Sequence, residues 1–172
     1  MKLFNLLPGL TGRARTSPFW LSILNVFLNR VVPFNRPHGF RLAEIGEEHV
    51  VTSGPWRRVN HNHLRGIHAC AIATVAEMSA GFLLLSKLEL QHYRLIMSRI
   101  EVDYHYQAKM QIFSRSSLST ERLEAEVVKP LRSQDSVSIV MQSTVTDRSG
   151  NGIAEARTTW QIKRWDRVET SL

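Results

Sequence analysis

Residues 68 to 88 form a long apolar segment made largely of small side chains, and this segment constrains the fold more than any other part of the chain. Its small residues are Ala69, Cys70, Ala71, Ala73, Ala76, Ala80 and Gly81. Small residues on most sides of a helix let a sheet curl closely around it. One carboxylate, Glu77, lies near its middle, and burial of an unpaired carboxylate is costly. We therefore predict a core helix rather than a membrane span, and a functional role for Glu77.

The segments that flank this helix read as strands joined by short connections. Such strands form an antiparallel sheet, and one helix lying on it gives the α+β class. Within the strand at 95–106, alternation predicts that Ile96, Ser98, Ile100, Val102, Tyr104 and Tyr106 share one face. The predicted strands are 40–45 and 49–53 before the helix, then 95–106, 123–127, 137–146 and 153–164 after it.

The N-terminal region is basic and contains an amphipathic helix. Ser17 and Pro18 form a helix start, and the apolar spacing continues to near Pro33. The first 43 residues hold no acid and supply +6 of the net charge of +7. That charge suits an anionic partner or simply a well-solvated surface. The aromatic residues lie on an apolar stripe, which disfavours nucleic acid; packing on the domain or a partner subunit is preferred to peripheral membrane contact.

The length of 172 residues suits one domain with a proper core. A single cysteine, Cys70, excludes an internal disulfide and suits a reducing compartment. The apolar start from Leu3 to Leu7 is too short for a secretory signal, and the run from Phe19 to Val32 is too interrupted to span a bilayer. We predict a cytoplasmic protein.

A polar loop leads directly into the apolar helix, and its residues form a recognisable pattern. Asn62, Gly66, His68 and Glu77 resemble the N-x-x-x-G-x-H-G-G-x(6)-[DE] signature of hotdog-fold acyl-CoA thioesterases of the phenylacetyl-CoA thioesterase type. The segments 32–34 and 41–45 also resemble the entry of that fold, in an uncharacterised branch of it. The resemblance in element order covers about residues 33 to 164.

The resemblance implies a long central helix wrapped by a curved antiparallel sheet, a homodimer and hydrolysis of a thioester. It divides the chain into an N-terminal helical extension (1–36), a hotdog domain (37–166) and a tail (167–172). Two positions depart from the pattern: Ala69 and Cys70 replace the glycines that follow the histidine. Alanine keeps the backbone N–H that would contact the substrate carbonyl, but its side chain narrows the space through which the substrate reaches that N–H.

Helical geometry makes a separate prediction about the site. The start of the helix would offer unpaired N–H groups around His68 and Ala69 to a developing oxyanion. Glu77 follows His68 by nine residues, which corresponds to about 900° of rotation and about 13.5 Å of rise. The two side chains then face opposite sides of one helix. If they share a site, the second half comes from another subunit.

These considerations give a set of candidate site residues. Glu77 is the proposed base or nucleophile, His68 a neutral orienting group, and Asn62 a ligand for water or substrate, or alternatively a turn residue. The substrate-binding candidates are Gly66, Ala69, Cys70, Arg58 and Arg65, where the arginines would meet coenzyme A phosphates. His49, His61 and His63 have no second ligand cluster at suitable spacing, so we predict neither a metal nor another cofactor.

The predicted function is therefore hydrolysis of acyl-CoA or acyl-carrier thioesters at a site shared across a homodimer, with tetramers left open. Two alternatives remain. The first is a hydroxyacyl dehydratase that uses His63 and Glu77, although the Pro- and Gly-rich segment expected between them is absent. The second is a hotdog protein that binds acyl-CoA without catalysis, which the basic N-terminus would suit.

Overall fold

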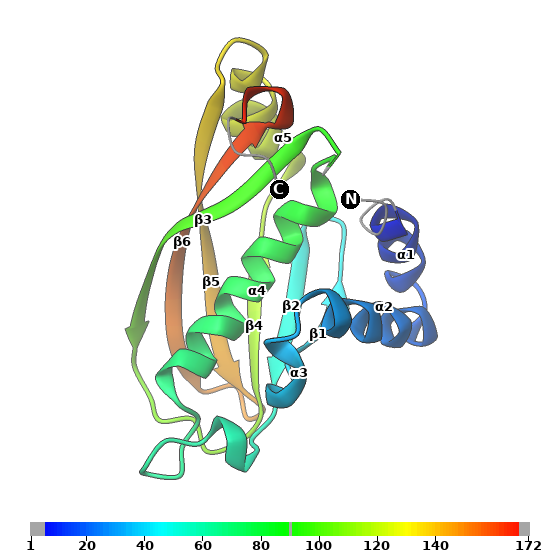
Figure 1. Cartoon of the computed structure of the whole chain (residues 1–172). Helices are drawn as coiled ribbons and strands as arrows, with labels where there is room; N and C mark the ends of the chain where they lie inside the picture. The colour runs from blue at the N-terminus through cyan, green and yellow to red at the C-terminus, as the bar shows by residue number, and fades with distance from the viewer. Residues whose placement is uncertain (1–5, 90, 169–172) are drawn as a thin grey trace.

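A six-stranded antiparallel sheet wraps around one long helix (Figure 1). The computed structural model describes residues 6–89 and 91–168. The sheet has the order β1-β2-β4-β5-β6-β3. Its strands are β1 (Arg41–Ile45), β2 (His49–Gly54), β3 (Tyr93–Tyr104), β4 (Ile112–Ser117), β5 (Ser136–Asp147) and β6 (Gly152–Arg164). The helices are α1 (Leu7–Ala14), α2 (Pro18–Val31), α3 (Asn35–His38), α4 (Ala69–Lys87) and α5 (Thr120–Leu123). Three short 3₁₀ helices, η2 (Arg58–Asn60), η4 (Pro130–Arg132) and η5 (Trp165–Arg167), and one π-helix, η3 (Glu124–Val128), complete the described elements.

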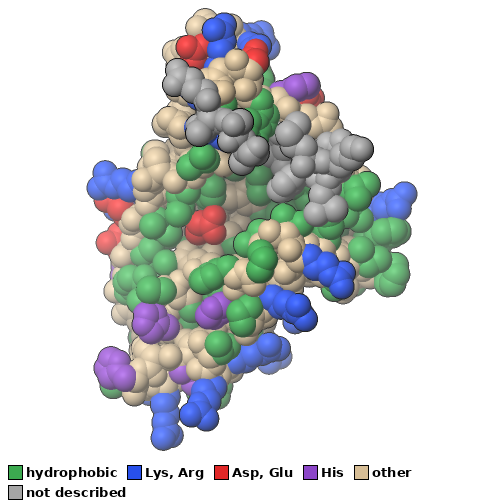
Figure 2. Space-filling view, viewed as in Figure 1, with side chains coloured by type: hydrophobic (Ala, Val, Ile, Leu, Met, Phe, Trp, Pro, Cys, Tyr) green, Lys and Arg blue, Asp and Glu red, His purple; other side chains and the backbone are tan. Residues whose placement is uncertain are grey.

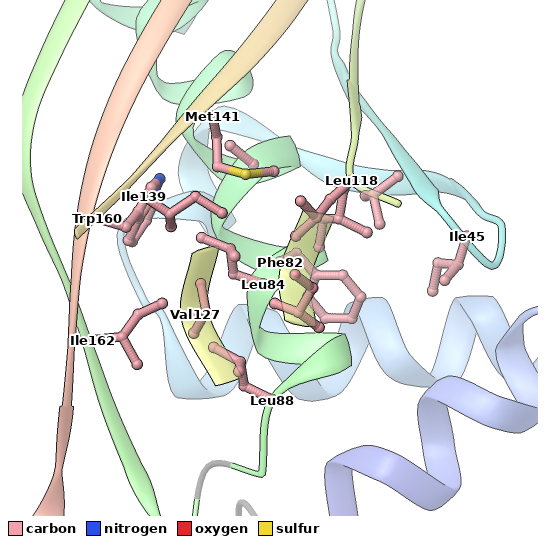
Figure 3. Packing of buried hydrophobic residues seen from close by; sticks show 14 of the residues in the cluster. Ile45, Phe82, Leu84, Leu88, Leu118, Val127, Ile139, Met141, Trp160 and Ile162 are labelled. Atoms are coloured by element: carbon pink, nitrogen blue, oxygen red, sulfur yellow. The ribbon is translucent and has the colours of Figure 1, made fainter. Parts of the chain in front are cut away.

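The predicted central helix is α4, and its apolar side chains hold the molecule together. Its C-terminal half packs between the sheet and the π-helix η3, as Figure 3 shows for Phe82 and Leu84, and Leu88 directly after the helix joins the same cluster. Trp160 and Val127 close the same cluster from β6 and η3. α4 is long and apolar enough to cross a membrane by length and composition, yet most of it is buried inside the molecule. It is the core helix of the fold.

Buried hydroxyl groups join α4 to the strands behind it. The Ser79 hydroxyl lies 2.9 Å from that of Ser114 on β4 and 3.2 Å from that of Ser143 on β5. Thr52 on β2 donates to the carbonyl oxygen of Val75 at 2.7 Å. Because these groups satisfy one another away from water, they fix the rotation of α4 against the sheet.

The N-terminal helices lie beside α4 at the edge of the sheet (Figure 1). α2 begins at Pro18 as predicted, although the Ser17 side chain makes no capping hydrogen bond. The side chain of Asn25 ties α2 to β1, since it donates to the Leu42 carbonyl at 2.9 Å and accepts from the Leu42 N–H at 2.7 Å. α1 had not been predicted. The N-terminal residues 1–5 and most of the predicted tail, from 169 onward, lie outside the described residues.

The prediction of a strand at 123–127 is wrong. This segment is helical: α5 continues into η3, and the missing strand is β4. Leu123 and Val127 fit a helical spacing of four as well as an alternating one, and both are buried. Ser119 caps the helix by accepting from the Arg122 N–H at 3.1 Å, and Arg122 pairs with Glu126 one turn on.

The predicted alternation in β3 is correct only in part. Ile96 is 46% exposed, whereas Leu95 and Met97 pack on the core. The register of β3 against β6 shifts between Met97 and Arg99, which makes Ser98 the extra residue of a bulge. A bulge exchanges the two faces of a strand, so Ile100, Val102 and Tyr104, which follow it, keep the predicted side, and the Tyr104 hydroxyl contacts α4.

Candidate active site

The loop that precedes α4 is held by Asn60, a residue that the sequence did not single out. Its amide donates to the carbonyl oxygens of His38 and Pro55, both at 2.9 Å. Its side-chain oxygen lies 2.8 Å from the His38 ring, and its carbonyl accepts the His68 N–H at 2.7 Å. Asn60 is 2% exposed. It therefore fixes the start of α4 against α3 and β2.

The side-chain oxygen of Asn62 shapes the tip of this loop, and its side-chain NH₂ group stays available for a ligand. Its side-chain oxygen accepts the backbone N–H groups of Leu64 at 2.9 Å and Gly66 at 3.0 Å. This is the turn role that was one of two predicted for Asn62. Within the described residues its NH₂ group has no hydrogen-bond partner. Gly66 is packed tightly, since a Cβ there would lie 3.2 Å from the Ala108 carbonyl oxygen.

The start of α4 offers one free N–H group rather than the several that were predicted. The His68 N–H is taken by Asn60, and the Cys70 N–H donates to Nδ1 of His68 at 3.1 Å. The His68 imidazole thus caps the helix, and as an acceptor at Nδ1 it carries its proton on Nε2 when neutral. The Ala69 N–H finds no acceptor in residues 6–89 and 91–168. It is the donor left at the positive end of the helix.

Asn62 and Ala69 line the same cavity, which has a volume of about 310 Å³. Its opposite wall is the end of β3 and the segment that follows, including Tyr104. The Tyr104 hydroxyl donates to the Ala69 carbonyl at 3.0 Å, and burial raises the pKa of this phenol. A neutral hydrogen-bond donor therefore braces the first turn of α4 beside its free N–H.

Glu77 lies in a second, larger cavity of about 520 Å³ on the outer face of α4. Figure 2 shows this face hollowed over α4, with hydrophobic side chains around the hollow. Among the described residues, Glu77 has neither a hydrogen-bond partner nor an ion pair. Burial raises the pKa of its carboxyl group from 4.5 to about 7. A carboxyl group with such a pKa can accept a proton near neutral pH.

The two halves of the predicted site lie apart within one chain. Asn62 and Ala69 belong to one cavity, and Glu77 and Cys70 belong to the other. From Ala69 to Glu77 the helix rises about 12 Å. His68 is not among the described residues that line either cavity, so the expectation that His68 and Glu77 face opposite sides of the helix stays a prediction.

The predicted arginines lie exposed at the rim of the loop, where Arg58 starts η2 and Arg65 has a positive φ of 61°. Figure 2 shows Lys and Arg side chains along the lower and right-hand edges of this face. His63 is also exposed, and His49 pairs with Glu44 at 2.7 Å. No group of three or more candidate metal ligands occurs within the described part of the chain.

Comparison with solved structures identifies the architecture as the hotdog fold. A Pseudomonas aeruginosa protein of unknown function, PA5026, described as a probable thioesterase, superposes with a TM-score of 0.76 at 20% identity, covering 83% of this chain and 95% of that one. A mutant of the thioesterase PA1618 from the same organism gives 0.66 at 14% identity, with coverage of 84% and 94%. The thioesterase HI1161 from Haemophilus influenzae gives 0.63 at 12% identity, with coverage of 81% and 90%.

The chain therefore has the hotdog fold, as the sequence predicted. The chain belongs to the family described as "Domain of unknown function (DUF4442)", whose model matches residues 21–162. That match starts inside α2 and includes both cavities. No curated protein gives a significant match.

Proposed function

We propose that this protein hydrolyses acyl-CoA thioesters at a site formed by two subunits of a homodimer. The observation that supports this most is Glu77, a carboxylate without a partner among the described residues and with a pKa near neutrality in an apolar cavity. Structural neighbours described as thioesterases support the reaction class. The free N–H of Ala69 and the amide of Asn62 supply the complementary donors.

In the proposed reaction, the Glu77 carboxylate takes a proton from water as the water oxygen bonds to the thioester carbonyl carbon. Negative charge develops on the carbonyl oxygen, where the Ala69 N–H and the helix dipole stabilise it. The C–S bond then breaks, coenzyme A leaves as a thiolate that takes up the proton held by Glu77, and the carboxylic acid is released. His68 holds the first turn in place by accepting the Cys70 N–H.

The two halves of the proposed site require a second subunit because they lie in different cavities of one chain. β3 is an edge strand of 12 residues that pairs only with β6 among the described strands. A long unpaired edge is a template for pairing with another chain. Two-fold pairing along β3 places two copies of α4 near one another and generates two identical sites.

Mutation of the acid tests the reaction directly. We expect Glu77→Gln to lower kcat for acyl-CoA hydrolysis by at least about 100-fold, because general base catalysis contributes about 10²–10⁴. Binding of the substrate should persist. Loss of the ultraviolet thioester absorbance is the suitable readout, since the exposed Cys70 would react with thiol reagents. Glu47→Gln, at an exposed turn, is the matched control. Hydrolysis by the Glu77→Gln variant at the wild-type rate would refute the role of Glu77.

Subunit mixing tests whether the site is shared. Glu77→Gln and Asn62→Ala each disable both sites of their own homodimers. In a mixed dimer, one site combines the intact loop of the first variant with the intact Glu77 of the second. Random exchange of subunits makes about half of the dimers mixed, and each mixed dimer has one intact site of two. Mixing should therefore restore about a quarter of wild-type activity. If mixing restores nothing, the two residues act within one chain or not together.

A further inference from the structure

The N-terminal helices form one wall of the cavity that contains Glu77. Leu28 from α2, with Val32 and Phe34 from the connection into α3, lines this wall. Leu28 is buried in the core, whereas Val32 and Phe34 are 42% and 59% exposed and form the rim. The wall is fixed rather than loosely attached, because Asn25 binds the backbone of β1.

The remaining walls are also apolar. α4 contributes Phe82 and Leu85, and the sheet contributes Met97 and Trp160. Among the described residues, those that line the cavity include no Lys, Arg or His, and Glu77 is the one carboxylate. A carboxylate brought into this cavity would find no cation among these residues to pair with and would face Glu77, so its binding is disfavoured.

The position of Glu77 indicates how a substrate would lie in the cavity. Glu77 lies eight residues before Leu85, which corresponds to about 12 Å along the helix axis. A thioester whose carbonyl lies at Glu77 can therefore extend its acyl chain along α4, between the N-terminal helices and the edge of the sheet. The volume of about 520 Å³ falls within the usual range for small-molecule sites.

We propose that this groove binds an uncharged, apolar acyl group of medium length, and that Val32 and Phe34 of the N-terminal extension set the length accepted. The inference rests on the proposed function, because it assigns the acyl part of the same substrate. Burial of each added methylene stabilises binding by about 0.8 kcal/mol, which corresponds to about fourfold in KM.

Straight-chain acyl-CoA substrates of increasing length, with succinyl-CoA as a charged counterpart, test the proposal. We expect KM to fall about fourfold per methylene up to a limiting length, and succinyl-CoA to be the poorest substrate of its size. Val32→Trp should shift the limit to shorter chains and Phe34→Ala to longer ones. Both side chains are substantially exposed, so these variants retain the core. Val26→Trp, at an exposed position of α2 outside the groove, should leave the profile unchanged.

Equilibrium binding of non-hydrolysable acyl-CoA thioethers separates failure of this inference from failure of the proposed function. Chain-length-dependent binding that Val32→Trp shifts, without hydrolysis of any thioester, would support the groove and refute the hydrolase. Hydrolysis with a flat length profile, or preference for succinyl-CoA, would refute the groove. If Val32→Trp weakens dimer formation in sedimentation velocity experiments and leaves the length profile unaltered, a second copy of the chain occupies the groove and the inference fails.

Discussion

Gly81 on α4 lies directly against the indole ring of Trp160 on β6: a Cβ atom at position 81 would come within 2.6 Å of that ring. The same Cβ would lie 3.3 Å from the Glu77 carboxylate. The glycine thus allows a large aromatic side chain and the proposed base to meet on one face of the helix. The indole N–H donates to Thr158 at 2.8 Å, which fixes the ring.

We therefore expect Gly81→Ala to destabilise the protein, although alanine is the better helix former. Overpacking against a fixed ring destabilises the protein by about 1–3 kcal/mol. The higher helix propensity of alanine stabilises it by only about 0.5–1 kcal/mol. Gly12→Ala is the matched control, because a Cβ at this exposed position of α1 meets no described residue within 4 Å. Urea denaturation should show a lower midpoint for the first variant and an unchanged or higher one for the second. Equal midpoints would contradict the contact.

Removal of the Asn60 side chain should loosen the loop before α4. Asn60→Ala leaves the carbonyl oxygens of His38 and Pro55 without their buried donor, which costs about 2 kcal/mol. We also expect faster hydrogen exchange at the His68 amide, because its acceptor is the Asn60 carbonyl. Asn29→Ala, on α2, makes no comparable contact in the described structure and should change neither quantity. An unaltered exchange rate at the His68 amide of Asn60→Ala would show that the loop keeps its conformation without the Asn60 side chain.

The buried serines should behave as one unit. Ser79→Ala removes a hydroxyl that both Ser114 and Ser143 contact, so the free energy of unfolding should fall by about 1–3 kcal/mol. In a double-mutant cycle, Ser79→Ala and Ser114→Ala should together cost less than the sum of the single changes. Additive costs, measured by denaturant titration, would argue that each hydroxyl is satisfied independently. Ser86→Ala is the comparison, because among the described residues the Ser86 hydroxyl bonds only to the Leu83 carbonyl of its own helix.

The same serines explain why one strand escaped prediction. β4 reads Ile-Phe-Ser-Arg-Ser-Ser, and its Ser114 and Ser116 face inward while Arg115 faces out. Hydrophobic alternation, the signal that located β5 and β6, is absent where the buried positions are polar and paired. The long helix was predictable to within one residue at each end, since length and composition alone distinguish it.

The site was predictable in its parts and less so in its connections. Glu77 stood out because a carboxylate in an apolar helix is unusual, and the loop pattern identified Asn62 and Gly66. Nothing in the spacing marked Asn60, whose role depends on contacts with α3 and β2. Nor could the sequence show that the His68 N–H is occupied, because that hydrogen bond depends on how the loop folds back.

The pKa of Glu77 predicts opposite effects of pH on stability and on activity. A carboxyl group with a raised pKa in the folded state holds its proton there after the unfolded chain has released it. Stability therefore decreases as the pH rises from 4.5 through about 7, by about 3 kcal/mol in total. Below this window Glu77 is protonated in both states and contributes nothing to the pH dependence.

Activity should show the reverse trend, because the proposed base must be ionised. We expect kcat/KM to rise about tenfold per pH unit below pH 7 and to level off above it. In the same titration, the free energy of unfolding of Glu77→Gln relative to wild type should increase by about 3 kcal/mol between acidic and mildly alkaline pH. Both curves should level off near the same pH, about 7, since both depend on the pKa of Glu77 in the folded state. A rate profile with a midpoint near 4.5, the ordinary value for this group, beside a stability difference that does not vary with pH, would mean that the carboxyl group is solvated and that another residue limits the reaction.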